Sequence, residues 1–315
     1  MPNLREYTWC CWQRCRSTPR SDAPAPGPGD RAQQWLGSSS RRDPAGGTAL
    51  INEDWWQTTF GDLDYWQWEG TPSPKRTLAD VGFIEQTLAL PAGARLLDIA
   101  CGLGRHALEF GRRGYQVTAF DWSAPFLTQA QQQATETGVE LTFVRGDMRA
   151  MEFRSEFDGA YLWENTFGMF SDAENLAVLR GVARALKPAG RFLVSNNAPR
   201  TLGAPGRTWR GDPEKDEWVS LLEYEPFDVR QHRNSLLITL WNTRTGERKQ
   251  HRWSTREYTF PEMTRMLSEA GLCFTEVYGD DADWSDFRGD GDPWPFTPAG
   301  FTHRASQRVI LATKE

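Results

Sequence analysis

The segment of this sequence best suited to chemistry contains an acidic residue within an apolar run, followed by two glycines. Residues 96–110 read LLDIACGLGRHALEF, in which Asp98 interrupts an apolar run, and Gly102 and Gly104 precede a helical pattern. Glycines in such a turn let a ligand approach the backbone closely, and the N-terminus of the following helix adds free amides and a partial positive charge. The turn is therefore predicted to hold a cofactor.

The glycine spacing alone leaves two classes of cofactor open. Gly102, Gly104 and Ala107 satisfy the dinucleotide pattern G-x-G-x-x-[GA], and Asp121 ends the next predicted strand, where a ribose-binding acid would lie. Hydride transfer with NAD is therefore one interpretation. Three features favour a cofactor other than NAD. They are an acid inside the first strand, Asp147 directly after the third strand, and the segment LRGVARALKPAGRFLVS leading into the fifth strand.

The elements that position these residues alternate between strands and helices. Strands are predicted at residues 94–100, 116–120, 141–144, 158–163 and 192–195, with helices beginning near Arg105, Ser123 and Asp172. Because parallel strands need helical crossovers, this alternation predicts an α/β fold with a doubly wound parallel sheet. Segments at residues 217–229, 235–242 and 247–254 instead predict antiparallel strands with a hairpin.

Composition limits the classes of protein that the chain can represent. Residues 1–49 carry seven Arg against four acids, whereas the remainder carries 29 Lys and Arg against 38 acids, so nucleic acid is not the expected partner. The five cysteines form no disulfide framework, and the cluster WCCWQRCR has no further ligand at metal-binding spacing. Since no apolar run of about 18 residues occurs, we expect a cytoplasmic protein that has no metal and no membrane contact.

The ordered motifs LLDIACGLGRH, VTAFDWS, RGDMRAM and LKPAG together resemble the class I S-adenosylmethionine-dependent methyltransferases. RTLADVGFIEQTL, ENTFGMFSD and STREYTFPEMTRMLSEAGLCFTEVYGD resemble a bacterial small-molecule branch of that family with an antiparallel lid insertion. The resemblance implies a Rossmann-like sheet of seven strands whose last strand is antiparallel. Ala189 departs from the usual glycine of LKPGG, which is a mild change in a loop.

The resemblance also implies which residues hold the cofactor, S-adenosylmethionine. The loop at residues 98–104 would wrap its methionine part, Asp121 would bind both ribose hydroxyls, and Asp147 would accept from the adenine amino group. The complete predicted set is Asp98, Ala100, Gly102, Gly104, Asp121, Trp122, Asp147, Met148 and Trp163.

Five segments are expected on these grounds. They are a disordered extension at residues 1–49, a helical cap at 50–93, the S-adenosylmethionine-binding core at 94–202, an antiparallel lid at 203–256, and the completion of the core sheet at 257–315. Residues 17–47 carry much Pro, Gly, Ser and Arg and too little apolar surface to order themselves.

The predicted reaction is methyl transfer to a nitrogen, oxygen or carbon atom of a small molecule. Glu164 is the candidate base beside the methyl group, and its alternative role is a cap or an ion-pair partner for the following helix. The candidate acceptor-binding residues are Trp56, Tyr65, Asn165, Phe167, Asn196 and Trp218. The tryptophans among them equally suit core packing. The alternatives are an NAD-dependent oxidoreductase and a non-catalytic cofactor-binding partner protein; the sequence predicts no oligomeric state.

Overall fold

The structure is a computed structural model that describes residues 54–63, 65–66, 72–164, 166–197, 206–279 and 307–315. These residues belong to one compact unit, Leu50–Glu315. The predicted disorder of residues 1–49 and the predicted role of Asn165 lie outside the described residues. The domain boundaries stay predictions.

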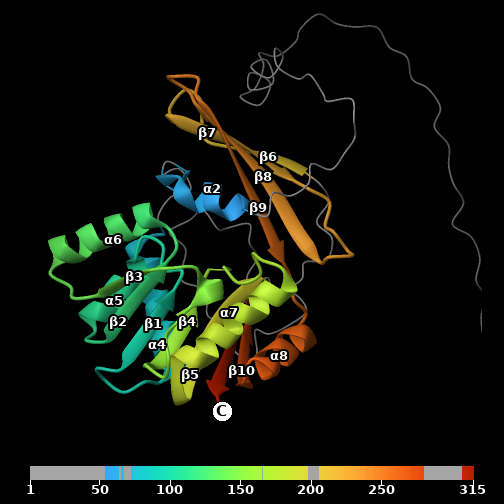
Figure 1. The fold of residues 1–315 in the computed structure, drawn as a ribbon. Helices are drawn as coiled ribbons and strands as arrows, with labels where there is room; N and C mark the ends of the chain where they lie inside the picture. The colour runs from blue at the N-terminus through green and yellow to red at the C-terminus, as the bar shows by residue number, and fades with distance from the viewer. Residues whose placement is uncertain (1–53, 64, 67–71, 165, 198–205, 280–306) are drawn as a thin grey trace, which may run out of the picture. The chain divides into compact units, whose positions relative to one another are not determined.

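The main sheet has seven strands in the order β10-β11-β5-β4-β1-β2-β3 (Figure 1). Its strands are β1 (Arg95–Ile99), β2 (Gln116–Asp121), β3 (Thr142–Arg145), β4 (Phe157–Leu162), β5 (Leu186–Asn197), β10 (Leu272–Gly279) and β11 (Gln307–Lys314). Strands β1 to β5 are parallel, and β11 runs antiparallel to both β5 and β10. The α/β class, the seven strands and the antiparallel last strand are confirmed.

The helices of the main unit begin and end largely where the sequence signals predict. They are α4 (Pro74–Leu88), α5 (Arg105–Arg112), α6 (Ala124–Thr137), α7 (Asp172–Ala185) and α8 (Phe260–Glu269), with the 3-10 helix η1 at Met148–Ala150. Ser171 and Thr259 both form complete capping boxes with the glutamate three residues after each, a spacing that is visible in the sequence. Helix α7 ends at Ala185, because Leu186 is already extended and begins β5.

The two faces of the main sheet carry separate hydrophobic cores. Leu97 packs in the core that includes Leu179 of α7 and Leu267 of α8, whereas its neighbour Leu96 packs in the core that includes Ile84 of α4. Successive strand residues point to opposite faces, so one buried strand serves both layers. The helices thus fix the strands whose carboxyl ends carry the candidate site.

A separate antiparallel sheet interrupts the chain between β5 and α8. It consists of β6 (Gly206–Arg210), β7 (Trp218–Tyr224), β8 (Arg233–Asn242) and β9 (Arg248–Arg256) in that order. The predicted insertion is confirmed, and β6 is a strand that the polar segment GRTWR did not indicate. Helix α2 (Trp55–Gly61) packs against β9. We call this four-stranded sheet the lid.

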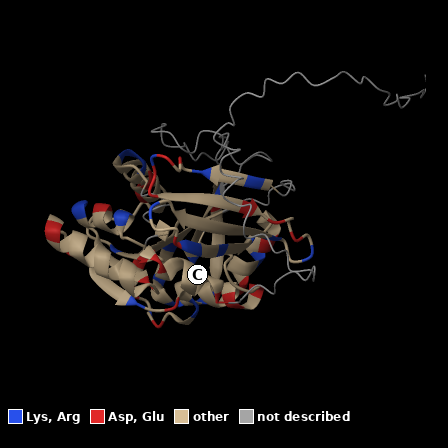
Figure 2. Ribbon diagram, turned by 90° about the horizontal axis from the view of Figure 1, so that it is seen from above, with Lys and Arg blue, Asp and Glu red and all other residues tan. Residues whose placement is uncertain are grey.

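Charged residues are interspersed over the described chain. Figure 2 shows acidic and basic positions alternating along the ribbon without a continuous band of one sign. Many form ion pairs, such as Lys187 with Asp158, whose Nζ and Oδ1 atoms lie 2.7 Å apart. Within the described helices, none is both long enough and apolar enough to cross a membrane.

Candidate active site at the carboxyl edge of the main sheet

A pocket opens where β1, β2, β3 and β4 end, and most of the predicted cofactor residues line it. They are Asp98, Ala100, Gly102, Asp121, Trp122, Asp147, Met148 and Trp163. Parallel strands present their carboxyl ends at one edge of a sheet, which is where open α/β folds bind ligands. The sequence spacing and the topology therefore bring these distant residues together.

The glycine turn has one residue that faces the pocket and one that serves packing. Gly102 has φ +56, and a Cβ added there would meet no protein atom within 4 Å. Gly104, with φ +77, lies off the pocket wall, and a Cβ there would come within 2.9 Å of the Ala130 Cβ in α6. Gly104 thus permits close packing of the turn against α6. The sequence predicted that Gly104 contacts the cofactor and did not predict this packing role.

Asp121 is held at the end of β2 by two backbone amides. The Gly102 N–H donates to Oδ2 at 2.8 Å, and the Ser123 N–H donates to Oδ1 at 2.8 Å. Burial raises the pKa of this carboxyl, and the backbone hydrogen bonds only partly counter the effect. Each carboxylate oxygen can accept two hydrogen bonds, so Asp121 keeps capacity for two further donors.

Asp98 has an unsatisfied oxygen beneath the glycine turn. Its side chain is 3% exposed, and Oδ2 has no hydrogen-bond partner within the described part of the chain. Burial raises the pKa of Asp98 to about 7; the neighbouring Tyr161 hydroxyl acts to lower it, and the negative charge of Asp121 acts to raise it further. A buried oxygen without a donor is costly, and either a ligand or the neighbouring Tyr161 hydroxyl, which is also buried without a partner in the described chain, can supply one.

Asp147 is fixed by an arginine that the sequence reasoning missed. Arg149 donates its backbone N–H to Oδ1 at 2.9 Å and its Nη2 to Oδ2 at 2.7 Å. The same guanidinium lies over the Phe170 ring at 4.5 Å and over the Trp56 ring at 5.3 Å. Although partial burial raises the pKa of Asp147, the hydrogen bonds and charge of Arg149 lower it overall. Neither the spacing nor the type of Arg149 distinguishes it from a surface arginine in the sequence.

Glu164 forms an ion pair with Arg105, the first residue of α5, directly after the glycine turn. Arg105 is largely buried and also donates Nη1 and Nη2 to Asp80 Oδ2 of α4, both at 3.0 Å. Glu164 has φ +57, and its side chain is half exposed at the pocket wall. Its partner therefore belongs to α5, whereas the sequence suggested the helix that follows Glu164.

The buried acid Asp80 anchors this arrangement. Its Oδ1 accepts from Arg76 Nε at 2.7 Å, and His106 Nε2 lies 3.3 Å from Oδ2. Burial acts to raise the pKa of Asp80, but the His106 hydrogen bond and the charges of Arg105 and Arg76 lower it to about 2. Burial and the charge of Arg105 lower the pKa of the pocket-lining His106, although its hydrogen bond with Asp80 acts in the opposite direction. The network holds Arg105, and through it Glu164, at the pocket.

Aromatic side chains from the N-terminal segment and the lid cover the pocket. Phe60 of α2 stacks with Trp66 at 5.5 Å between ring centroids and meets Trp253 of β9 edge-on at 5.3 Å. Trp66 also meets Phe126 in the first turn of α6 at 5.7 Å. All four line the pocket, and we call them the aromatic roof.

Four of the predicted acceptor-binding residues lie away from the pocket wall. Tyr65 and Trp218 pack in the core of the lid, where the Tyr65 Oη accepts from Trp253 Nε1 at 2.8 Å. Phe167 packs against Tyr258 in the main core. Asn196 is buried on β5. Of the described members of that set, Trp56 reaches the pocket.

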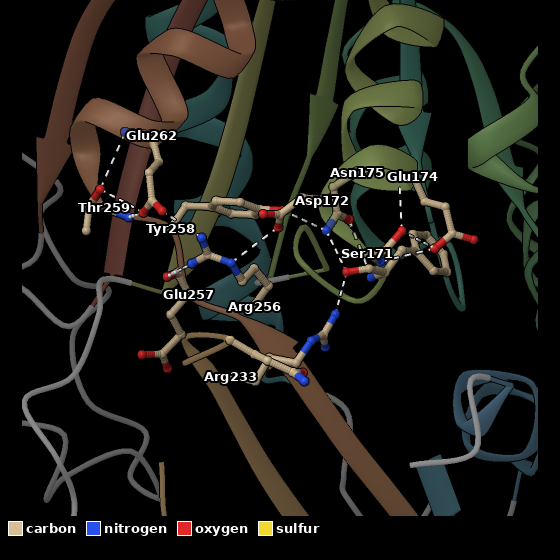
Figure 3. A network of polar contacts seen from close by, with 12 residues as sticks. Ser171, Asp172, Glu174, Asn175, Arg233, Arg256, Glu257, Tyr258, Thr259 and Glu262 are labelled. Atoms are coloured by element: carbon tan, nitrogen blue, oxygen red, sulfur yellow. Dashed lines mark hydrogen bonds and ion pairs between the residues drawn. The ribbon is translucent and has the colours of Figure 1, made fainter. Parts of the chain in front are cut away.

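Polar contacts at the base of the lid fix the pocket segment at residues 168–170 (Figure 3). Arg233 of β8 donates Nη2 to the backbone carbonyls of Met169, at 3.4 Å, and Phe170. Asn175 also donates Nδ2 to the Phe170 carbonyl at 2.8 Å. Because Met169 and Phe170 line the pocket, lid residues help to set the shape of the pocket wall.

A second set of contacts ties β9 to the two capped helices (Figure 3). Arg256 pairs with Asp172 at 3.2 Å and with Glu262 at 2.6 Å, and its backbone N–H donates to the Gly168 carbonyl at 2.7 Å. A Cβ on Gly168 would lie 2.4 Å from the Arg256 carbonyl oxygen. Glycine is therefore required where the end of the lid meets the pocket segment.

Comparison with known proteins identifies the class of this site. Residues 96–190 match a family described as "Methyltransferase domain". The chain is 30% identical over 227 residues to the cypemycin N-terminal methyltransferase of Streptomyces sp, an alignment that covers 71% of this chain and 84% of that protein. The chain therefore belongs to the class I S-adenosylmethionine-dependent methyltransferases, and it is such an enzyme rather than an NAD-dependent oxidoreductase.

Solved structures share the fold. The CcbJ methyltransferase from Streptomyces caelestis has a TM-score of 0.63 at 19% identity, covering 81% of this chain and 98% of that one. CalS10, an amino pentose methyltransferase from Micromonospora echinaspora solved with S-adenosylmethionine bound, has a TM-score of 0.56 at 17% identity, covering 81% and 97%. Nearly the whole length of each of these two proteins aligns with this chain.

The pocket residues fit S-adenosylmethionine, the cofactor of the family. The unpartnered Asp98 Oδ2 suits the ammonium group of a methionine moiety, and the open space beside Gly102 lets a ligand approach the turn. The remaining hydrogen-bond capacity of Asp121 suits a pair of ribose hydroxyls. No group of three or more metal-ligating side chains occurs in the ranges that the structure describes.

Proposed function

We propose that this enzyme methylates a nitrogen, oxygen or carbon atom of a small molecule that binds between Glu164 and the aromatic roof. The observation that carries the proposal is one pocket that joins three strand-end acids, an arginine-held glutamate and four aromatic rings. Aromatic walls bind apolar or cationic groups and exclude water. The relative at 30% identity is an N-terminal methyltransferase, which favours nitrogen as the methylated atom.

In this proposal, each of the three strand-end acids binds a different part of the cofactor. Asp98 holds the ammonium group of the methionine part, Asp121 holds the ribose hydroxyls, and Asp147 accepts from the adenine amino group. The supporting observations are the unpartnered oxygen of Asp98, the two amides that orient Asp121, and the arginine that orients Asp147. Carboxylates also suit a cofactor whose reactive sulfonium is positive.

Glu164 is the proton acceptor in this proposal, and Arg105 positions it. When bound, S-adenosylmethionine supplies an electrophilic methyl group and leaves as S-adenosylhomocysteine. An amine or hydroxyl acceptor must also lose a proton, which the half-exposed Glu164 carboxylate can take at the pocket wall. Alignment of the acceptor by the roof and exclusion of water supply the rest of the rate enhancement, up to about 7–11 kcal/mol in favourable cases.

Calorimetry on the full chain tests the cofactor part of the proposal. We expect S-adenosylhomocysteine to bind and NAD not to bind, and we expect Asp121→Ala to weaken binding at least tenfold. Asp158→Ala is the matched control, because Asp158 lies at the opposite end of the sheet and pairs with Lys187. Equal binding by the two variants would contradict the role of Asp121.

Product formation tests the acceptor part. Purified enzyme is given labelled S-adenosylmethionine with amino sugars, peptides with free N-termini, and phenols, and labelled products are identified by mass spectrometry. Glu164→Gln should lower kcat for the best acceptor while leaving S-adenosylhomocysteine affinity unchanged. A Glu164→Gln enzyme with full kcat at every pH would exclude Glu164 as the base.

A further inference from the structure

We propose that Trp56 is a cofactor-binding residue whose indole N–H donates a hydrogen bond to the nucleoside half of S-adenosylmethionine. The sequence assigned Trp56 to the methyl acceptor, and the new assignment rests on the proposed positions of the ribose and adenine at Asp121 and Asp147. Three observations carry it: the neighbours of the ring, the state of its N–H, and its place in the pocket wall.

The neighbours of Trp56 are the residues that flank the proposed nucleoside site. The ring meets Trp122, which directly follows Asp121, edge-on at 4.9 Å between centroids. On another side, the guanidinium of Arg149 lies 5.3 Å from the ring centroid while holding the Asp147 carboxylate. Trp56 therefore spans the ends of β2 and β3, where the ribose-binding and adenine-binding acids lie.

Among the described residues, none accepts a hydrogen bond from the indole N–H of Trp56. Trp56 is 4% exposed, and its Nε1 is buried without a hydrogen-bond acceptor in the described ranges. Buried tryptophans usually satisfy this donor, as Trp253 does by donating to Tyr65 Oη at 2.8 Å. Because Trp56 lines the pocket, a ligand bound there can supply an acceptor.

A nucleoside offers the kind of atom that this donor requires. The ring nitrogens of adenine, the oxygens of ribose and the methionine carboxylate accept hydrogen bonds, whereas the ammonium and the sulfonium of the cofactor cannot. The contacts of the Trp56 ring with Trp122 and Arg149 favour the nucleoside over the carboxylate. Around Glu164, by contrast, the polar partner is the Arg105 guanidinium, which is itself a donor. The position of the Trp56 ring and the chemistry of its N–H thus both match the nucleoside.

Replacing the N–H while keeping the ring shape tests this role directly. We would incorporate 3-benzothienylalanine, in which sulfur replaces the N–H, at position 56 of the full chain. S-Adenosylhomocysteine affinity, measured by calorimetry, should fall about fivefold to tenfold, as expected for one lost hydrogen bond. The thermal midpoint of the protein without ligand should stay unchanged or rise, because an unsatisfied buried donor is removed.

The same replacement at Trp55 is the matched control. Trp55 is buried in the same helix and packs against Trp253 at 5.9 Å, but it does not belong to the wall of this pocket. Its replacement should change the affinity less than twofold. A twofold or smaller change at position 56, or a lower midpoint without ligand, would overturn the proposal, since the N–H would then serve the acceptor or the fold.

A shorter ligand locates the hydrogen bond within the cofactor. Methylthioadenosine contains the nucleoside and the thioether but no amino acid part, and it is measured by competition with S-adenosylhomocysteine. It should lose affinity by the same factor at position 56; an undiminished affinity would place the hydrogen bond on the carboxylate and overturn the nucleoside assignment. If the wild-type protein binds S-adenosylhomocysteine and Asp121→Ala does not, the proposed cofactor site stands even if the proposed role of Trp56 is wrong.

Discussion

Asp98 should make the protein without cofactor less stable as the pH rises from 5 to 8. Burial raises its pKa from 3.8 to about 7, and its Oδ2 has no hydrogen-bond partner in the described chain. Well below pH 3.8 the carboxyl is protonated in both the folded and the unfolded state, so it has no effect. Between pH 4 and 7 the folded state binds more protons than the unfolded state, and stability therefore falls as the pH rises.

The expected size of this effect follows from the pKa shift. A shift from 3.8 to about 7 corresponds to about 4 kcal/mol of lost stability above pH 7, at about 1.36 kcal/mol for each pKa unit. At pH 5 the loss is only about 1–2 kcal/mol, because the unfolded carboxyl has begun to ionise. Asp98→Asn cannot ionise, so its stability relative to wild type should improve by about 3 kcal/mol between pH 5 and pH 8.

Urea denaturation of wild type and Asp98→Asn at the two pH values measures this difference. The cost of the buried amide is the same at both pH values and cancels, as do all groups common to the two proteins. Asp158→Asn is the control, because the Lys187 ion pair lowers the pKa of Asp158 in spite of partial burial. A relative stability of Asp98→Asn that changes by less than about 1 kcal/mol would refute the reasoning.

Three further substitutions test the packing, the buried ion network and a helix cap, each by urea denaturation. Gly168→Ala should cost about 3 kcal/mol or more, because its Cβ would lie 2.4 Å from the Arg256 carbonyl oxygen, whereas Gly246→Ala, with positive φ but open space, should cost about 1 kcal/mol; equal losses would contradict the clash. Asp80→Asn should cost about 2 kcal/mol at pH 7 and half of that at pH 3, because its neighbouring cations lower its pKa to about 2 in spite of burial, and a depressed pKa stabilises only above that value; a constant difference would exclude this origin. Thr259→Ala should cost about 1 kcal/mol through the lost capping box, and an unchanged midpoint would show that the cap is dispensable.

The sequence by itself determined the main sheet and the edge at which the site lies. Alternating apolar strands and amphipathic helices are local patterns, and short-range geometry allows few arrangements of them. The caps at Ser171 and Thr259 depend on residues only three positions apart, which is why they could be predicted. Asp121 and Asp147 could be placed because they directly follow strands, and strand ends meet at one edge.

Only the tertiary structure decided which side chains converge on the pocket. Tyr65 and Trp56 belong to the same aromatic segment, yet one packs in the lid core and the other lines the pocket. Arg105 reaches Asp80 of α4 and Glu164 after β4, contacts between residues far apart in the sequence. An aromatic or charged residue has the same local pattern whether it faces a core, a partner or a ligand. The difference is made by long-range packing, which no spacing within one element encodes.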